Sequence, residues 1–176
     1  MTRASINLIL GVLGLLHGAG AWALSSDRNQ PMQIDADHAD IDQQQGTSVY
    51  RGNVRLARGS MVLLADEVVV KQDHGNIRLV VATGSPASYR QRSDKQQDVR
   101  ASAQRMEYHV DSGQLLLIKQ AELHQDANVF ASERIVYDSV ADRVNAGANA
   151  ALPQGRVHII IQPGTSSVPS ATPAPQ

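Results

Sequence analysis

The alternation of apolar and polar residues constrains the fold of this chain most strongly. Residues 31–37 (Pro-Met-Gln-Ile-Asp-Ala-Asp), 54–56 and 108–110 alternate with a period of two, as half-buried β-strands do. Short aliphatic runs, mostly β-branched residues or Leu, lie at 61–64, 68–70, 79–81, 115–118 and 157–161. Turn signals separate the runs at 45–46, 58–60, 73–76, 111–113 and 125–128. Because no sustained helical period occurs outside the N-terminal stretch, an all-β fold is predicted.

Two sequence pieces recur along the alternating region. The first, at 36–42, 65–71, 102–108 and 131–137, has a small residue, a polar stretch and then apolar positions. The second is Val-x-x-Gly, at 49–52, 81–84 and 144–147, with Leu117-Ile-Lys-Gln120 at the corresponding place of the remaining unit. A glycine that recurs at one place of a strand is typical of a bulge or a corner. The pattern predicts a stack of similar β-hairpin units, open at both ends, with chance self-similarity of strands as the alternative.

The two ends of the chain differ from its middle. Arg3, an apolar run over 6–16 and Ala21-Trp22-Ala23 have the order of a secretory signal peptide, so residues 1–23 are expected to be cleaved. An uncleaved N-terminal anchor is the alternative. Residues 24–30 are predicted to be a flexible lead-in, and the Pro/Ser/Ala-rich residues 163–176, which lack charge, a disordered tail. The folded domain is therefore expected over 31–162.

Composition excludes several function classes. The chain has no cysteine, which rules out disulfides, cysteine zinc sites, iron–sulfur clusters and thiol catalysis. With 16 basic and 17 acidic residues, it lacks the basic excess of a nucleic-acid-binding protein. The sequence also contains no nucleophile elbow, P-loop or dinucleotide fingerprint. No cofactor and no catalytic residue is predicted.

The segment Asp35-Ala-Asp-His-Ala-Asp-Ile-Asp42 looks most like a chemical site. Carboxylates beside an imidazole can hold a divalent cation or act as an acid/base pair. The spacing fits neither a calcium loop nor a zinc helix. On a strand, Asp35 and Asp37 also share a face that Asp40 leaves unless the strand bends. Solvent-exposed carboxylates beside a turn are the preferred interpretation, and no metal site is predicted.

The apolar positions of the strands fall on consistent parities and define one inward face. This set comprises Met32, Ile34, Tyr50, Val54, Leu56, Met61, Leu63, Tyr89, Tyr108, Val110, Leu115, Leu117 and Leu123. The set can form a tightly packed core, or it can line an apolar groove that holds an acyl chain. With only 3% aromatic residues, few large side chains are available to fill the interior, which favours the groove.

Several motifs together resemble the OstA-like domain family. They are Gln30-Pro-Met-Gln-Ile-Asp-Ala-Asp37, Tyr50-Arg-Gly-Asn-Val-Arg-Leu56, Gly59-Ser-Met-Val-Leu-Leu-Ala-Asp66 followed by Val68-Val-Val70, and Gly84-Ser-Pro-Ala87. The similarity extends over about 30–162. One departure is the segment 94–98, which lacks the glycine of a clear turn. The resemblance implies an open-ended, twisted antiparallel β-jellyroll with an apolar interior.

The resemblance also implies a function, namely a non-enzymatic bridge for lipopolysaccharide in the periplasm. Such a bridge shields the acyl chains of lipid A and receives lipopolysaccharide from an inner-membrane ABC transporter complex. Carried over to this chain, the lipid-binding candidates are Met32, Ile34, Tyr89, Tyr108 and Val110, with Tyr50 and Leu117 added on strand parity. The implied partners are an LptC-like inner-membrane protein at the N-terminal edge and an LptD-like outer-membrane protein at the C-terminal edge. Further copies of the chain are expected to join head to tail by strand addition.

Two other functions stay open on the sequence alone. A self-assembling structural β-module would use the same open edges without binding lipid. An exported, metal-dependent glycan hydrolase would rest only on the Asp35–Asp42 segment.

Overall fold

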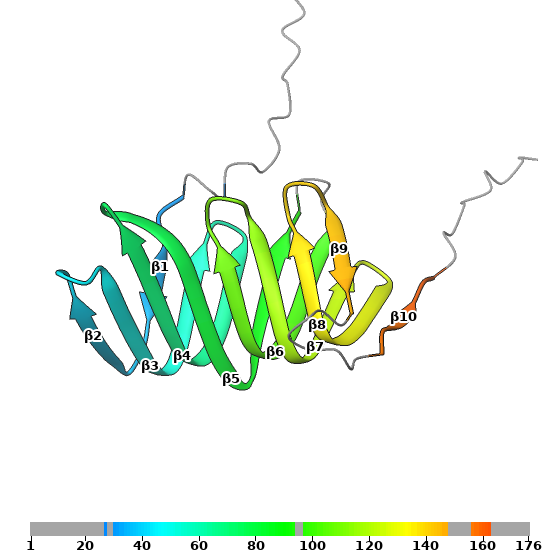
Figure 1. Ribbon diagram of the computed structural model, residues 1–176, viewed down its shortest axis with the longest axis horizontal. Coiled ribbons are helices and arrows are strands. Elements are labelled where there is room, and N and C mark those ends of the chain that lie inside the picture. The colour runs from blue at the N-terminus through cyan, green and yellow to red at the C-terminus, as the bar shows by residue number, and fades with distance from the viewer. Residues whose placement is uncertain (1–26, 28–29, 94–96, 148–155, 163–176) are drawn as a thin grey trace, which may run out of the picture.

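The computed structural model describes residues 27, 30–93, 97–147 and 156–162, and these form a single antiparallel β-sheet (Figure 1). Its strands are β1 (Gln33–Asp35), β2 (His38–Asp42), β3 (Thr47–Arg58), β4 (Met61–Asp73), β5 (Asn76–Arg92), β6 (Asp98–His109), β7 (Gln114–Gln125), β8 (Asn128–Asp138), β9 (Arg143–Ala146) and β10 (His158–Ile160). The predicted all-β class is confirmed. Among the described residues, no helix has the length and apolar character needed to cross a membrane.

The strands follow one another through the sheet in the order β1-β3-β4-β5-β6-β7-β8-β10. Strand β2 pairs with β3 beside β1, and β9 pairs with β8 beside β10. Figure 1 shows β1 and β2 at one end of the stack and β9 and β10 at the other. No pairing between these ends closes the sheet within the described residues, so the molecule is an open β-jellyroll with two free edges.

Each long strand bends in its middle, so the sheet folds over on itself as a V. The pairing register shifts between Arg51 and Val54 of β3, and comparable shifts occur in every neighbouring pair through β8. The bends gather on one side of the stack and most hairpin turns on the other (Figure 1). We call the two halves arm A and arm B. Arm A comprises 33–35, 54–58, 61–65, 87–92, 98–103, 121–125, 128–132 and 158–160; arm B comprises 38–42, 47–51, 67–73, 76–83, 105–109, 114–118, 134–138 and 143–146.

The recurring sequence pieces mark the corners of the V. Gly52 has φ +77° and lies at the register shift of β3, and Gly84 lies at that of β5. Gln120, which replaces the glycine in the third unit, has φ +50° and lies at the shift of β7. Corner geometry is therefore kept even where the glycine is absent. The predicted bulges and hairpin stack are confirmed.

Hydrogen bonds fix the first corner. Between β1 and β2, the Asp37 backbone N–H donates to the Gly52 carbonyl oxygen at 3.0 Å. The Asn53 Nδ2 amide donates to Asp37 Oδ2 at 2.8 Å. The Asp37 carboxylate, which belongs to the Asp35–Asp42 segment, therefore stabilises the bend of the sheet.

The core fills the space between the two arms. Its buried apolar residues are Val54, Leu56, Met61, Leu63, Val68, Val70, Val80, Ala82, Ala87, Tyr89, Val99, Ala101, Ala103, Met106, Tyr108, Leu115, Leu117, Ala121, Leu123, Ile135 and Tyr137. Met32, Ile34, Tyr50 and Val110 are partly buried against them. Every residue of the inward set predicted from parity thus lies in or against this core.

Asp27 is part of the fold, although it lies in the lead-in 24–30 that was predicted to be flexible. Its side chain is only 7% exposed. It accepts hydrogen bonds from the Ser60 backbone N–H at 3.0 Å, from Ser60 Oγ–H at 2.6 Å and from Gln91 Nε2 at 3.2 Å. These donors compensate for the cost of burying the carboxylate. The hydrogen bonds anchor Asp27 to arm A and the adjoining turn. The expected signal peptide, 1–23, and tail, 163–176, lie outside the described residues.

Candidate lipid-binding interior

An apolar row crosses the inner face of arm A from one edge of the sheet to the other. The residues are direct cross-strand partners: Ile34, Leu56, Leu63, Tyr89, Ala101, Leu123, Phe130 and Ile159. Each strand of arm A contributes one member. No polar side chain interrupts the row, so arm A presents a continuous apolar track along the stack.

Arm B carries two comparable rows. The row nearer the corner consists of Ala39, Tyr50, Val68, Ala82, Met106, Leu117, Ile135 and Ala146. The second consists of Ile41, Ser48, Val70, Val80, Tyr108, Leu115, Tyr137 and Val144, in which Ser48 is the one residue that is neither aliphatic nor aromatic. The facing rows of the two arms enclose an interior that extends over the whole length of the V.

The structure places all seven lipid-binding candidates on this interior. Tyr89, Tyr108 and Leu117 are buried, and each belongs to one of the three rows. Ile34 and Tyr50 belong to the rows near the N-terminal edge, where burial is only partial. Met32 and Val110 lie outside the rows and are also partly buried.

Met32 and Val110 meet at the open side of the V. They line a cavity of about 410 Å³ together with Gln30, Arg58, Ile77, Arg78 and Asp111. Arg58 lies at the arm A end of a hairpin and Arg78 near the arm B end of another, so the cavity spans the two arms. Arg78 pairs with Asp111 and, at 3.6 Å, with Asp73. We call the open side of the V the mouth. At this cavity the mouth brings apolar side chains next to charged ones, a combination that matches an amphiphile.

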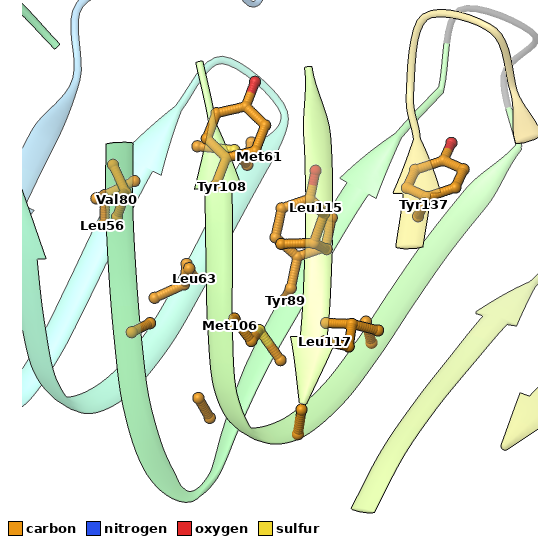
Figure 2. Close-up of a cluster of buried hydrophobic side chains, with 14 of the residues drawn as sticks. Leu56, Met61, Leu63, Val80, Tyr89, Met106, Tyr108, Leu115, Leu117 and Tyr137 are labelled. Atoms are coloured by element: carbon orange, nitrogen blue, oxygen red, sulfur yellow. The ribbon is translucent and has the colours of Figure 1, made fainter. Parts of the chain in front are cut away.

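Three tyrosines lie on the inner face with their hydroxyl groups toward the open side of the V. Figure 2 shows the oxygen atoms of Tyr89, Tyr108 and Tyr137 on the side away from the strand bends. The Tyr89 hydroxyl donates to Gln91 Oε1 at 2.6 Å, and Gln91 in turn donates to Asp27. Burial, with smaller contributions from the two other tyrosines and Asp27, raises the pKa of Tyr89 well above its usual range. The rings thus present apolar surface inward and polar atoms at the mouth.

The Asp35–Asp42 segment is exposed to solvent. All of its strand β2 is exposed, and the ion pair of Asp35 with Arg55 is long, at 3.7 Å. In the described part of the chain, no three His, Asp or Glu side chains lie close enough together to hold a metal ion. The prediction of solvent-exposed carboxylates beside a turn is confirmed.

Tyr137 is the largest fully buried side chain that sequence parity missed. It is buried directly across from Leu115, which in turn lies across from Tyr108. The recurring sequence pieces contained the signal, because Tyr137 ends the unit 131–137 as Tyr108 ends the unit 102–108. Ile77 at the mouth carried no comparable signal, since it lies beside a turn whose position in space depends on the fold.

An antiparallel sheet bent over an apolar interior that reaches both edges defines an open β-jellyroll, and comparison with known proteins agrees. Residues 33–143 match the family model of the LptA/(LptD N-terminal domain) LPS transport proteins. The chain belongs to this family.

Individual relatives support the assignment. The chain is 39% identical over 165 residues to the lipopolysaccharide export system protein LptH of Pseudomonas aeruginosa, covering 90% of this chain and 94% of the relative. It is 28% identical to LptA of Haemophilus influenzae, covering 85% and 87%, and to LptA of Escherichia coli K12, covering 77% and 74%. The crystal structure of LptH, described as the LptA-homologous periplasmic component of the lipopolysaccharide transport device of P. aeruginosa, superimposes with a TM-score of 0.73. That match has 38% identity and covers 78% of this chain and 99% of LptH.

Proposed function

We propose that this chain is a periplasmic lipopolysaccharide bridge that carries lipopolysaccharide with its acyl chains in the interior of the V. The observation that carries the proposal is that the apolar row of arm A and the row of arm B nearer the corner run without a break from edge to edge. A closed core needs no such continuity, whereas a conduit does. The export proteins related to this chain support lipopolysaccharide as the cargo and a carrier as the class of protein, not an enzyme.

The acyl chains would contact the seven residues selected from the sequence: Met32, Ile34, Tyr50, Tyr89, Tyr108, Val110 and Leu117. Acyl chains are hydrocarbon, so burial of apolar area would supply the affinity. Because Tyr89, Tyr108 and Leu117 pack closely in the structure described, a guest would enter by parting the two arms. The partly buried residues Met32 and Val110 at the mouth would be the first to meet it.

The two free edges would join the chain to its partners. At the N-terminal edge, β1 and β2 would pair with the edge of an LptC-like inner-membrane partner or with the preceding copy. At the C-terminal edge, β9 and β10 would pair with an LptD-like outer-membrane partner or with the next copy. Open strand edges invite this kind of addition, and head-to-tail pairing would continue the apolar rows from one unit to the next.

The terminal segments complete the proposal. Residues 1–23 would direct export and be cleaved, which places the mature chain in the periplasm, and residues 163–176 would remain outside the fold as a tail. Residues 31–162 would constitute the jellyroll domain, with Asp27 anchoring the lead-in to it.

Depletion of the protein in its own bacterium tests the bridge function. Newly made lipopolysaccharide, followed by pulse labelling and membrane fractionation, is expected to accumulate in the inner membrane and to reach the outer membrane again when the chain is restored. Normal delivery during depletion would contradict the proposal and favour the structural β-module. The variant with Asp35→Ala and His38→Ala is expected to restore delivery fully. If it did not restore delivery, the metal-dependent hydrolase would become the favoured function.

A further inference from the structure

The outer face of arm A carries a concentration of arginine that the acyl-chain interior does not explain. Arg90 and Arg92 of β5 lie beside Arg100 of β6. The register places Arg90 directly opposite Arg100. Like charges in this arrangement destabilise a sheet. The fold therefore tolerates an unfavourable pair where nearly any polar residue would serve on the exposed surface.

One carboxylate is shared among these arginines. Asp98 lies 3.8 Å from Arg92 Nε and 3.4 Å from Arg100 Nη2, both loose pairs between well exposed side chains. The Arg90 side chain makes no hydrogen bond or ion pair with any residue that the structure describes. The Asp126 carboxylate nearby accepts a hydrogen bond from the Asp98 backbone N–H. The arginine cluster, defined as Arg90, Arg92 and Arg100, therefore keeps unused donors and excess positive charge.

The cluster has the shape as well as the charge of a site. Its three arginines line a hollow of about 450 Å³ with Ser60, Gln91 and Asp98. A second hollow of about 330 Å³ adjoins it, because Arg92, Asp98 and Arg100 also line that one, together with His124 and Asp126. Arginine presents several N–H donors in a planar fork that matches phosphate oxygens.

The position of the cluster connects it to the mouth of the V. Arg92 and Asp98 form the last residue pair before the β5–β6 turn, at the open side of arm A. Tyr89 precedes Arg90 in the strand and belongs to the inner apolar row. Arg90 lies two strand residues, about 7 Å, from Arg92 in that last pair, so the cluster reaches the open end of the strands whose inner faces carry the apolar row.

We infer that the arginine cluster binds the phosphorylated saccharide headgroup of the amphiphile whose acyl chains occupy the interior. The inference rests on the proposed function. It adds a second, polar anchor on the opposite face of the same strands. Phosphate groups on the disaccharide of lipid A supply the negative charge that complements Arg90 and Arg100. Binding at both faces would fix the orientation of the cargo during transfer.

A pair of charge-matched double variants tests this site. Arg90→Gln with Arg100→Gln removes two members of the cluster. Arg51→Gln with Arg105→Gln removes the same charge from arm B, where Arg51 pairs with Glu67 at 2.8 Å and Arg105 with Glu107 at 2.7 Å. Dissociation constants are measured on the full mature chain for diphosphorylated and monophosphorylated lipid A, in competition with a fluorescent lipid A analogue. Inorganic phosphate alone is the third probe.

The wild type is expected to bind diphosphorylated lipid A about three- to tenfold more tightly than the monophosphorylated form, since exposed arginine–phosphate contacts have modest strength. The Arg90/Arg100 variant is expected to lose this preference and the Arg51/Arg105 variant to keep it. Equal effects of both variants, no preference in the wild type, or equally strong competition by inorganic phosphate would overturn the inference. Wild-type binding of both lipids without preference would leave the bridge function standing, whereas binding of neither would contradict both proposals.

Discussion

Gly52 shows how a single backbone position shapes this molecule. Its φ of +77° is readily adopted only by glycine. A Cβ atom at this position would also lie 2.4 Å from Asp37 Oδ2. The residue thus allows β1 and β2 to turn the corner of the V while Asp37 keeps its bonds to the neighbouring strand.

The substitution Gly52→Ala is therefore expected to lower the free energy of unfolding by about 1–3 kcal/mol, through the strained φ and the displaced carboxylate. Urea unfolding followed by circular dichroism measures the change. Gly75→Ala is the matched control, because Gly75 has a similar φ of +79° but open space around its Cβ position. A smaller loss is expected there. An equal loss at both sites would mean that the contact with Asp37 carries no weight.

The pH dependence of the free energy of unfolding tests whether the Tyr89 hydroxyl is buried. Because the pKa of Tyr89 is raised in the folded state, the native chain keeps its proton above pH 10, where an exposed tyrosine in the unfolded chain ionises. The stability contributed by the neutral ring is complete below pH 10 and is lost as pH rises toward the native pKa. At pH 7, Tyr89→Phe is expected to be about 1 kcal/mol less stable, through loss of the hydrogen bond to Gln91.

Above pH 10 this difference between the wild type and Tyr89→Phe is expected to shrink, because phenylalanine has no proton to lose. Urea unfolding of both proteins from pH 7 to 11 follows it. A difference that stays constant over the whole range would show that the Tyr89 hydroxyl is accessible to solvent in the folded chain.

At the scale of elements, the sequence pattern predicted the strands and the inward face but not how the faces change along each strand. In β4, Met61 and Leu63 are inward on odd positions, whereas Val68 and Val70 are inward on even ones. One residue inserted at the corner reverses the parity. In strands β3 and β7 two residues are inserted at the corner, so the inward positions have the same parity on both sides of it. Periodicity within a segment cannot reveal the size of the insertion, which depends on pairing with distant strands.

Within the lead-in, composition gave no sign that Asp27 would be fixed. Ser, Asp, Asn and Gln around Asp27 are typical of flexible segments, yet Asp27 is fixed by donors from Ser60 and Gln91, which lie far away in sequence. Only the fold brings those donors together. At Gly59, in the turn beside Ser60, a Cβ would lie 2.0 Å from Asp27 Oδ1, so this turn and Asp27 fit each other closely.

Asp27→Ala is expected to cost about 1–3 kcal/mol, because it leaves the partly buried Ser60 and Gln91 groups without their acceptor. Asp42→Ala is the control, since Asp42 accepts hydrogen bonds from the Gln44 and Gln45 backbone in an exposed turn. About 0.5–1 kcal/mol is expected there. Thermal unfolding of chains that begin at Leu24 gives both values. If Asp27→Ala proved as stable as the wild type, the lead-in would not be anchored in solution.

For the whole molecule, one apolar row of arm B ends on an exposed side chain at the N-terminal edge, and the apolar row of arm A does so at the C-terminal edge. Ile41 at the N-terminal edge is 57% exposed and Ile159 at the C-terminal edge is 48% exposed. In a head-to-tail array these ends would be covered by the neighbouring copy. How the rows of two units meet depends on two chains, so the sequence of one chain suggests an arrangement only through its resemblance to a family.

Ile41→Lys is expected to weaken self-association about tenfold, because roughly 1–2 kcal/mol of apolar burial is lost at the joint. Val140→Lys is the control: Val140 is 61% exposed but lies in the turn between β8 and β9, away from the edge strands. Sedimentation velocity over a range of concentrations compares the two variants with the wild type. Equal weakening by both would point to nonspecific hydrophobic contact in place of edge pairing.

Photocrosslinking in cells tests most directly that the interior of the V holds the acyl chains. Leu117 faces the interior and its neighbour Leu116 faces outward. Met32 at the mouth and Gln33 beside it offer a second, less buried pair. A photoreactive amino acid at 117 or 32 is predicted to capture lipopolysaccharide, while the same group at 116 or 33 captures little. Equal capture at the inner and outer members of both pairs would contradict the account.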